Sequence, residues 1–308
     1  MTWTIHRVRV AAEQAGSRLD QYLATAVPEL SRTRLRRIID LGGVHINDRR
    51  TRTCSYRLAA ADLVEIYLDN LPLEPYRIAA ADLVYQDKYL IVLNKPAMIE
   101  TQPTHARYKG TLYEALQEYL KDPFRPQQKP PIGMIQRLDR STSGLIVFST
   151  HPAAHKKMTE MFHLQRIDKH YLAIVGGAPA SAAGEIRSQL ARSRKENRVH
   201  SVTAGGKLAV TRYAVQKRLN HSTLMKVQIL TGRSHQIRAH MAEQGCPLLG
   251  DQRYGGLTEV DGMPVTRPLL HAWRLAFQHP VTDRLLRFSV PLPHDMVAAL
   301  RHLQENHL

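Results

Sequence analysis

The sequence lacks most of what secreted, membrane-spanning and metal-binding proteins need. It has only two cysteines, Cys54 and Cys246, which lie far apart and form no metal-ligand pattern. So few cysteines are typical of a protein in a reducing cytoplasm. No stretch approaches the roughly 20 apolar residues of a membrane span, and residues 1–7 lack the apolar core of a secretory signal. We therefore expect a cytoplasmic protein with no membrane-spanning segment.

Acidic residues are scarce as well. The 27 aspartates and glutamates face 43 lysines and arginines, so the formal net charge is +16. A field of this sign attracts polyanions, and nucleic acid is the polyanion that best suits a cytoplasmic protein. Composition alone does not separate a nucleic-acid-binding protein from one that is merely basic. The apolar fraction of 43% is normal for a globular core and excludes a disordered chain.

Two helices and a strand are predicted near the N-terminus. Apolar residues at helical spacing predict a helix over 18–27. Ser31 is a good N-cap for a second helix, and Gly42 is a good terminator for it. Residues 44–47 alternate between apolar and polar side chains, which is typical of a strand.

Arginines are concentrated on and after the second predicted helix. Eight of them lie between Ser31 and Arg57, against two acidic residues. A solvated helix face normally mixes charges of both signs, so a cluster of one sign predicts a phosphate-binding surface. The candidates for phosphate contact are Arg32, Arg34, Arg36, Arg37, Arg49 and Arg50.

This arginine-rich region resembles a known module. The string SRTRLRRIIDLGGVHIND and its surroundings, about residues 15–68, are similar to the S-four-type (αL) RNA-binding domain. That resemblance implies structured RNA as the partner. A polar stretch with Pro72 and Pro75 follows and indicates a linker. We therefore expect an RNA-binding domain over 1–70, a linker over 71–81 and a second domain over 82–308.

The second domain mixes strands with a few helices. Its helices are expected at 111–120, 152–165 and 234–244, and strand patterns occupy much of the rest. Residues 178–207 indicate hairpins or a mobile insertion against the RNA. Strands without regular βα repeats predict an α+β fold with a largely antiparallel sheet.

One stretch of this domain combines charge with a buried strand. Residues 136–148 begin as a polar turn and continue as an apolar strand, with Asp139 flanked by Arg137 and Arg140. Nearby positive charge favours the ionised form of a carboxylate. Such a group suits nucleophilic work or anion-guided substrate capture better than general acid catalysis. The alternative is an Asx turn before a strand, and for a lone aspartate that is the more common case.

Four segments of the second domain resemble the RluA-type pseudouridine synthases. They are LIVLNKP (90–96), RLDRSTSGLIVF (137–148), KHYLAIVGG (169–177) and TGRSHQIRAHMAEQGCPLLGDQRYGG (231–256). The tail 269–282 also matches, so the resemblance covers about 83–293. It implies a mixed-sheet, α+β catalytic domain that isomerises uridine to pseudouridine in RNA. Large-subunit ribosomal RNA is the first expected substrate, and transfer RNA is the second.

The resemblance also implies roles for single residues. Asp139 is the expected catalytic residue, adding to C1′ or removing the 2′ proton; both routes stay open. Arg238 is expected to pair with Asp139. Tyr171 is expected to stack on the base and to help move the C5 proton. Arg137 is expected to contact the RNA where the nucleotide is flipped, because the glycosidic carbon is unreachable in a stacked helix.

Other readings of these residues remain possible at this point. Tyr171 could be edge packing, and Arg238 could be a cation on a helix surface. His235 is expected to cap or orient the helix of Arg238. The isomerisation needs no redox change or hydrolysis, so we expect no cofactor and no metal, and we expect a monomer. The competing functions are a non-catalytic RNA-binding ribosome-assembly factor and a base-removing glycosylase.

The sequence departs from the family pattern at three positions. Gln136 stands where a histidine usually precedes Arg-Leu-Asp, and Gln102 stands where His-Pro is usual. Met98 replaces the frequent glycine after Lys-Pro. The glutamines can form hydrogen bonds but cannot carry charge. These departures bear on the choice of substrate rather than on the presence of activity.

Overall fold

The computed structural model describes residues 4–193 and 198–305, and the chain divides into two compact units. The first unit comprises Met1–Ile78 and Ile99–Pro130, and the second comprises Ala79–Met98 and Pro131–Leu308. Residues 99–130 therefore interrupt the second unit in sequence but pack with the first. The sequence did not indicate that residues 99–130 pack with the first unit.

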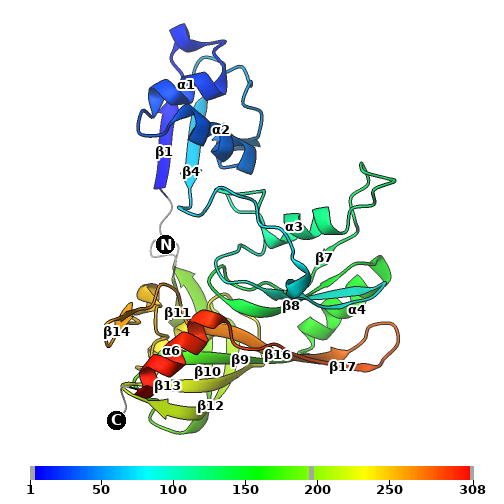
Figure 1. The fold of residues 1–308 in the computed structure, drawn as a ribbon, viewed down its shortest axis with the longest axis vertical. Coiled ribbons are helices and arrows are strands. Elements are labelled where there is room, and N and C mark those ends of the chain that lie inside the picture. The colour runs from blue at the N-terminus through cyan, green and yellow to red at the C-terminus, as the bar shows by residue number, and fades with distance from the viewer. Residues whose placement is uncertain (1–3, 194–197, 306–308) are drawn as a thin grey trace. The chain divides into compact units, whose positions relative to one another are not determined.

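The N-terminal part of the first unit, before residue 79, contains a small antiparallel sheet and the helices α1 and α2 (Figure 1). The strand order is β1-β4-β2-β3. The elements are β1 (Thr4–Arg9), α1 (Leu19–Ala26), α2 (Arg32–Leu41), β2 (Val44–Ile46), β3 (Arg49–Thr51) and β4 (Leu63–Leu68). The side chain of Ser31 accepts a hydrogen bond from the Arg34 N–H, and Gly42 ends α2 at φ +90°. Both predicted helix boundaries are confirmed.

The segment 99–130 packs closely on this small sheet unit. It contains α3 (Leu112–Tyr119). The carbonyl of Leu41 at the end of α2 accepts hydrogen bonds from the N–H groups of Tyr108 and Lys109, at 2.7 and 3.1 Å. Arg107 and Asp69 form a buried bidentate ion pair at 2.8 and 3.1 Å. Asp69 is thus anchored just before the stretch that was expected to be a linker.

The second unit is built on an eleven-stranded sheet. Its order is β11-β10-β12-β13-β9-β16-β8-β6-β5, with β17 paired to β16 and β7 to β8. The strands are β5 (Leu83–Gln86), β6 (Leu90–Lys95), β7 (Gly133–Met134), β8 (Ser143–Ser149), β9 (Asp168–Gly176), β10 (Ala183–Ser193), β11 (Arg198–Val202), β12 (Lys207–Leu219), β13 (Ser222–Ile229), β16 (Leu270–Gln278) and β17 (Leu285–Ser289). The β16–β8 pair is parallel and the other pairs are antiparallel. The predicted α+β class with a largely antiparallel sheet is confirmed.

Smaller elements complete the second unit. They are α4 (Pro152–His163), α5 (Gln236–Glu243), α6 (His294–Glu305) and the hairpin β14 (Glu259–Val260) with β15 (Met263–Pro264). Strands β10 and β11 pair with each other within residues 178–207, for which the sequence predicts hairpins or a mobile insertion. Residues 194–197 between them lie outside the described residues.

Side chains of β9 show which structures lie on each face of the large sheet. Ile174 packs with Met296 and Leu303 of α6, which crosses the sheet in Figure 1. Side chains alternate along a strand, so Tyr171 points to the opposite face. That face, away from α6, carries the candidate active site.

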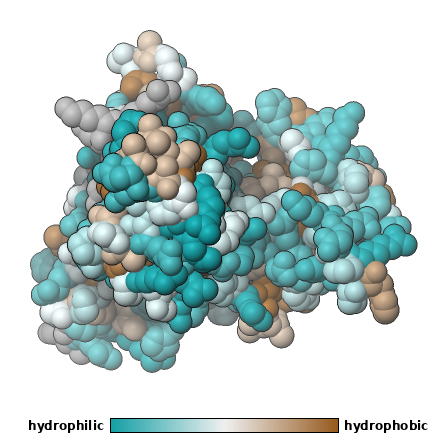
Figure 2. Space-filling view, turned by 90° about the horizontal axis from the view of Figure 1, so that it is seen from above, coloured by the Kyte–Doolittle hydropathy of each residue, from teal (hydrophilic) through white to brown (hydrophobic). Residues whose placement is uncertain are grey.

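Polar residues cover most of the face drawn in Figure 2, and its hydrophobic residues are scattered. Among the residues that the structure describes, the most exposed large hydrophobic side chain is Phe124, at 91%. Isolated residues of this kind are normal on protein surfaces. None of the helices formed by the described residues has the length and apolar character that a membrane span requires.

Candidate active site

Asp139 lies in the turn that leads into β8. The Thr142 N–H donates a hydrogen bond to the Asp139 carbonyl at 3.0 Å, which closes the turn. Gly144 follows at φ +109°, and a Cβ there would lie 2.3 Å from the carbonyl oxygen of Ala272 on β16. Only glycine allows this close approach of two backbones. The turn thus ends at a fixed point in the centre of the sheet.

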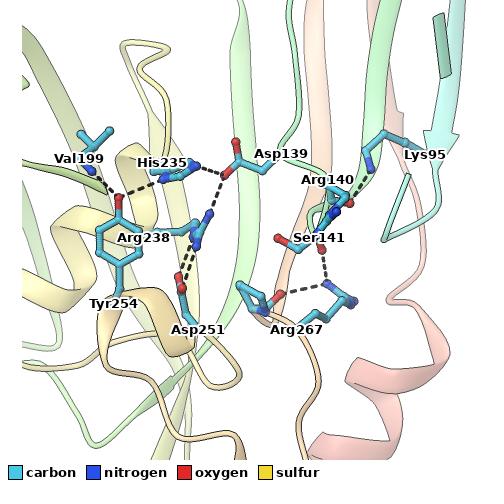
Figure 3. Close-up of polar contacts among 11 residues, drawn as sticks. Lys95, Asp139, Arg140, Ser141, Val199, His235, Arg238, Asp251, Tyr254 and Arg267 are labelled. Carbon is cyan, nitrogen blue, oxygen red and sulfur yellow. Dashed lines mark hydrogen bonds and ion pairs between the residues drawn. The ribbon is translucent and has the colours of Figure 1, made fainter. Parts of the chain in front are cut away.

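Two buried cations hold the backbone that follows Asp139 (Figure 3). Lys95 is fully buried, and its Nζ donates to the carbonyl of Arg140 at 3.2 Å. The Nη1 of Arg267 donates to the carbonyl of Ser141 at 2.9 Å. Arg267 also forms a bidentate ion pair with Asp295 of α6, at 2.6 and 2.9 Å. Consecutive carbonyls of the loop are therefore held by a cation of β6 and by Arg267, which is itself paired with α6.

Arg238 on α5 connects Asp139 to a second carboxylate. Its Nε and Nη2 donate to Asp251 at 2.6 and 2.8 Å, and its Nη1 donates to Oδ2 of Asp139 at 3.3 Å. Burial disfavours the charged guanidinium, but the hydrogen bonds and charge of Asp251 outweigh it and raise the pKa of Arg238. The bidentate pair fixes the plane of the guanidinium. The remaining Nη1 is thereby directed at Asp139.

Tyr171 on β9 lies level with this loop across β16. Ala272 pairs in register with both Tyr171 and Gly144. The phenol is 7% exposed, and burial together with the charge of Asp139 raises its pKa. The hydroxyl therefore keeps its proton at neutral pH. The expected set of Asp139, Tyr171 and Arg238 gathers in one place.

His235 does not cap α5 with its side chain. It occupies the N-cap position at φ +52° but makes no capping hydrogen bond, so that part of the expectation is wrong. Its Nδ1 lies 3.0 Å from the Oη of Tyr254, and its Nε2 lies 3.8 Å from Oδ2 of Asp139 (Figure 3). Burial lowers the pKa of His235 to about 4, so the imidazole is neutral.

The arginines proposed for RNA contact divide into two groups. Arg32 pairs with Asp20, Arg37 pairs with Glu74, and Arg50 donates to the carbonyls of Gly42 and Thr104. The other candidates, all exposed, form no ion pair within the described residues; they are Arg34, Arg36, Arg49 and Arg137. Arg34 and Arg36 lie on the exposed side of α2, as the sequence predicts, whereas Arg137 belongs to the second unit.

Several residues that shape the site were not singled out from the sequence. Asp251, Tyr254 and Lys95 lie inside the quoted motif segments, so a signal for them was present. Arg267 lies outside those segments. Among the departures from the family pattern, Met98 has φ +67°, a conformation that favours glycine. The Nε2 of Gln136 is buried without a hydrogen-bond partner among the described residues.

Comparisons with known proteins agree with this geometry. Residues 89–243 match the RNA pseudouridylate synthase family, and residues 17–64 match the S4 domain. The chain belongs to the RNA pseudouridylate synthase family. It is 34% identical to the ribosomal large subunit pseudouridine synthase D of Haemophilus influenzae, over 97% of this chain and 95% of that protein. It is 31% identical to an uncharacterized RNA pseudouridine synthase of Bacillus subtilis, over 97% of this chain and 98% of that one.

Solved structures share the fold of this family member. Human RNA pseudouridylate synthase domain containing 4 aligns with a TM-score of 0.59 at 24% identity, over 72% of this chain and 92% of its own. Human RNA pseudouridylate synthase domain containing 1 aligns with a TM-score of 0.54 at 25% identity, over 75% and 98%. The expected family, fold class and isomerase activity are confirmed, and RNA binding through the S4 domain with them.

Proposed function

We propose that Asp139 is the reacting carboxylate with which this pseudouridine synthase isomerises uridine in RNA. The observation that carries the proposal is the asymmetry of its surroundings. Arg238 and His235 both face Oδ2, while Oδ1 has no partner within residues 4–193 and 198–305. The side chain is 29% exposed. One oxygen is therefore held and the other is open to substrate.

The isomerisation exchanges one glycosidic bond for another. The N1–C1′ bond breaks, the base rotates, and a C5–C1′ bond forms; C5 loses a proton and N1 gains one, so the formula is unchanged. Oδ1 of Asp139 either adds to C1′ as the uracil leaves or accepts the 2′ proton. Arg238 holds the carboxylate in its orientation until that step.

Tyr171 serves in this scheme as a stacking surface and a proton carrier. Its buried ring faces the side of the sheet that bears Asp139. Because its pKa is raised, the phenol can accept the C5 proton only while it passes its own proton on. Asp139, whose charge acts on the phenol, is the neighbouring carboxylate that can receive it.

The RNA contacts follow from position and charge. Arg137 lies exposed two residues before Asp139 and contacts the RNA at the flipped nucleotide. The exposed arginines of the S4 domain contact phosphates farther along the RNA. Large-subunit ribosomal RNA is the proposed substrate, supported by the names of full-length relatives such as the synthase D of Haemophilus influenzae. Transfer RNA is the second choice.

The same proposal includes a cytoplasmic monomer. The two cysteines are free, which agrees with a reducing compartment. The non-catalytic assembly factor and the glycosylase are less well supported, because the chain belongs to a synthase family.

The test uses RNA carrying tritium at C5 of uridine. Asp139→Asn keeps the size of the side chain but can neither add to C1′ nor accept a proton well. We expect tritium release to fall below about a thousandth of the wild-type rate, with RNA affinity changed by no more than a few-fold. Substantial activity in this variant would remove Asp139 from the reaction, and release of free uracil by the wild type would indicate a glycosylase.

The substrate is tested separately, with transcripts of large-subunit ribosomal RNA and of transfer RNA. Pseudouridine should form in the ribosomal transcript, and mapping should place it at defined uridines. Formation only in transfer RNA would overturn the first choice of substrate without affecting the role of Asp139.

A further inference from the structure

A chain of hydrogen bonds leads from the β11 backbone to the candidate catalytic carboxylate. The Val199 N–H donates to the Oη of Tyr254 at 2.9 Å, and that Oη lies 3.0 Å from Nδ1 of His235. The Nε2 on the other side of the imidazole lies 3.8 Å from Oδ2 of Asp139. Figure 3 shows the four residues in this order. The role assigned to Asp139 above does not account for this chain.

The hydroxyl of Tyr254 has a single proton to donate, and this fixes the direction of its hydrogen bond with His235. Tyr254 is 3% exposed, and burial raises its pKa, so the phenol keeps its proton. Its oxygen already accepts a hydrogen bond from the Val199 N–H. Among the described residues, the remaining partner of Tyr254 is Nδ1 of His235. A buried hydroxyl that donates nowhere is costly, so the phenol donates to Nδ1.

This direction decides which nitrogen of His235 carries the hydrogen. A neutral imidazole has one donor nitrogen and one acceptor nitrogen. Because Nδ1 accepts from Tyr254, Nε2 must carry the hydrogen, and Nε2 faces Asp139. The opposite tautomer would present a lone pair to the carboxylate and repel it.

We propose that His235 is a positioning residue that holds Oδ2 of Asp139 through its Nε2–H, and that Tyr254 sets the tautomer that places this hydrogen there. The proposal rests on the role of Asp139 given above. The separation of 3.8 Å is longer than a hydrogen bond, so the N–H directs the carboxylate electrostatically and closes on it as the site tightens around substrate. With Arg238 on the same oxygen, Oδ1 is left to meet the substrate.

The unusual backbone of His235 serves the same arrangement. A left-handed φ of +52° is uncommon for a residue with a side chain. At the N-cap this residue would normally turn its side chain to the helix. The left-handed conformation instead places the imidazole between Tyr254 and Asp139. Strain of this kind is typical of residues held for function.

The first experiment observes the tautomer directly. The wild-type protein is labelled with ¹⁵N-histidine, and the ring nitrogens of His235 are assigned by comparison with His235→Gln. We expect a protonated Nε2 and an unprotonated Nδ1 at neutral pH. The reverse tautomer, or an imidazolium, would overturn the proposal. The tautomer is measured in the wild-type protein, and His235→Gln serves only to assign the signals.

The second experiment measures single-turnover rates and RNA affinity separately. His235→Leu should lower the rate by about 10- to 100-fold, with affinity within a few-fold of wild type. His235→Gln places an amide N–H near the position of Nε2 and should recover part of the loss. Tyr254→Phe removes the hydroxyl that sets the tautomer, so its rate should fall between those of the wild type and His235→Leu.

His240→Gln is the matched control within α5, the helix whose N-cap position His235 occupies. His240 is fully buried and bonds to Ser188 and Thr211 rather than to the site. If His235 acted only through the stability of α5, the control would slow the reaction as much as His235→Gln, and the proposal would fail. A normal rate in His235→Leu beside an inactive Asp139→Asn would refute the positioning role alone. Activity in Asp139→Asn would instead refute the proposed function.

Discussion

Tyr171 has two roles in the proposed reaction, and each role depends on a different part of its side chain. Stacking needs only the aromatic ring, whereas proton transfer needs the hydroxyl. The raised pKa of Tyr171 means that the hydroxyl is protonated before the reaction. It can therefore carry the C5 proton only as part of a relay.

Tyr171→Phe separates these two functions. We expect RNA binding to change little, because base–aromatic stacking of about 1–3 kcal/mol survives the substitution. Tritium release should fail, because no hydroxyl remains to carry the C5 proton. The measurement combines tritium release with a search for rearranged, unreleased RNA. Normal turnover would leave Tyr171 as a stacking surface only.

The sequence predicts those parts of the site that a family motif contains. Asp139, Tyr171 and Arg238 were identified by resemblance, and the structure brings them together. The chain from Val199 through Tyr254 to His235 was not predicted, because its members are joined by hydrogen bonds across the fold rather than by spacing. Hydrogen-bond direction depends on burial and on the partners that are available, and the sequence does not contain that information.

At the scale of elements, local signals predicted local structure. The Ser31 cap and the Gly42 terminator predicted α2, and strand patterns in the second domain predicted a largely antiparallel sheet. Strand β1 was missed because its partner β4 lies more than 50 residues away, and its exposed residues give a weak pattern. The packing of 99–130 with the first unit was also missed. It depends on long-range contacts such as Arg107–Asp69, which no local pattern indicates.

Gly144 allows β8 to approach β16 closely, and this approach positions the turn that carries Asp139. Gly144→Ala would place a methyl group 2.3 Å from the Ala272 carbonyl oxygen, so β8 and β16 must separate. We expect a loss of stability clearly larger than the about 1–2 kcal/mol of a left-handed alanine, together with slower turnover. Urea denaturation and single-turnover kinetics measure the two effects.

Gly177→Ala is the control for this substitution. Gly177 also has a positive φ, +70°, but a Cβ added there would have no atom within 4 Å. Gly177→Ala therefore has the free-energy cost of a positive φ at alanine but no steric clash. Equal losses of stability in the two variants would show that the close approach of β8 to β16 does not require glycine at position 144.

At the scale of the whole molecule, buried neutral histidines make stability depend on pH. Burial lowers the pKa of both His235 and His271 to about 4, with the charges of Arg238 and Arg267 adding to the effect. An unfolded chain takes up these protons below about pH 6.5. The folded chain binds them only below about pH 4, so stability is lost as the pH falls through this window.

His271→Asn tests this dependence through stability alone, because Nδ1 of His271 lies 2.9 Å from Oγ of Ser143, beside the active-site loop. We expect the wild type to lose unfolding free energy between pH 6.5 and 4, with His271 contributing on the order of 3 kcal/mol. Asn cannot titrate, so the variant should lose less over the same range, whatever its stability at pH 7. Urea denaturation at several pH values measures both proteins. Parallel pH profiles would contradict the lowered pKa of His271.

RNA affinity is the second property of the whole molecule that charge controls. Deleting the first 70 residues would be a poor test of the S4 domain, because it removes Asp69 and leaves Arg107 without its buried partner. Point substitutions avoid this damage. Arg34, Arg36 and Arg49 are exposed and free of ion pairs within the described residues, so replacing them should not unfold the first unit.

The triple variant Arg34→Ala, Arg36→Ala, Arg49→Ala should bind RNA with a shallower salt dependence. Each phosphate contact contributes about 0.7–0.9 to the slope of log affinity against log salt, so loss of all three should reduce the slope by about 2–3. The control replaces three exposed arginines of the second unit, Arg284, Arg287 and Arg301, and removes the same net charge. Filter binding at several salt concentrations gives both slopes. If the control lowers the slope as much as the triple variant does, the effect comes from net charge, and the arginines of the S4 domain are not specific phosphate contacts.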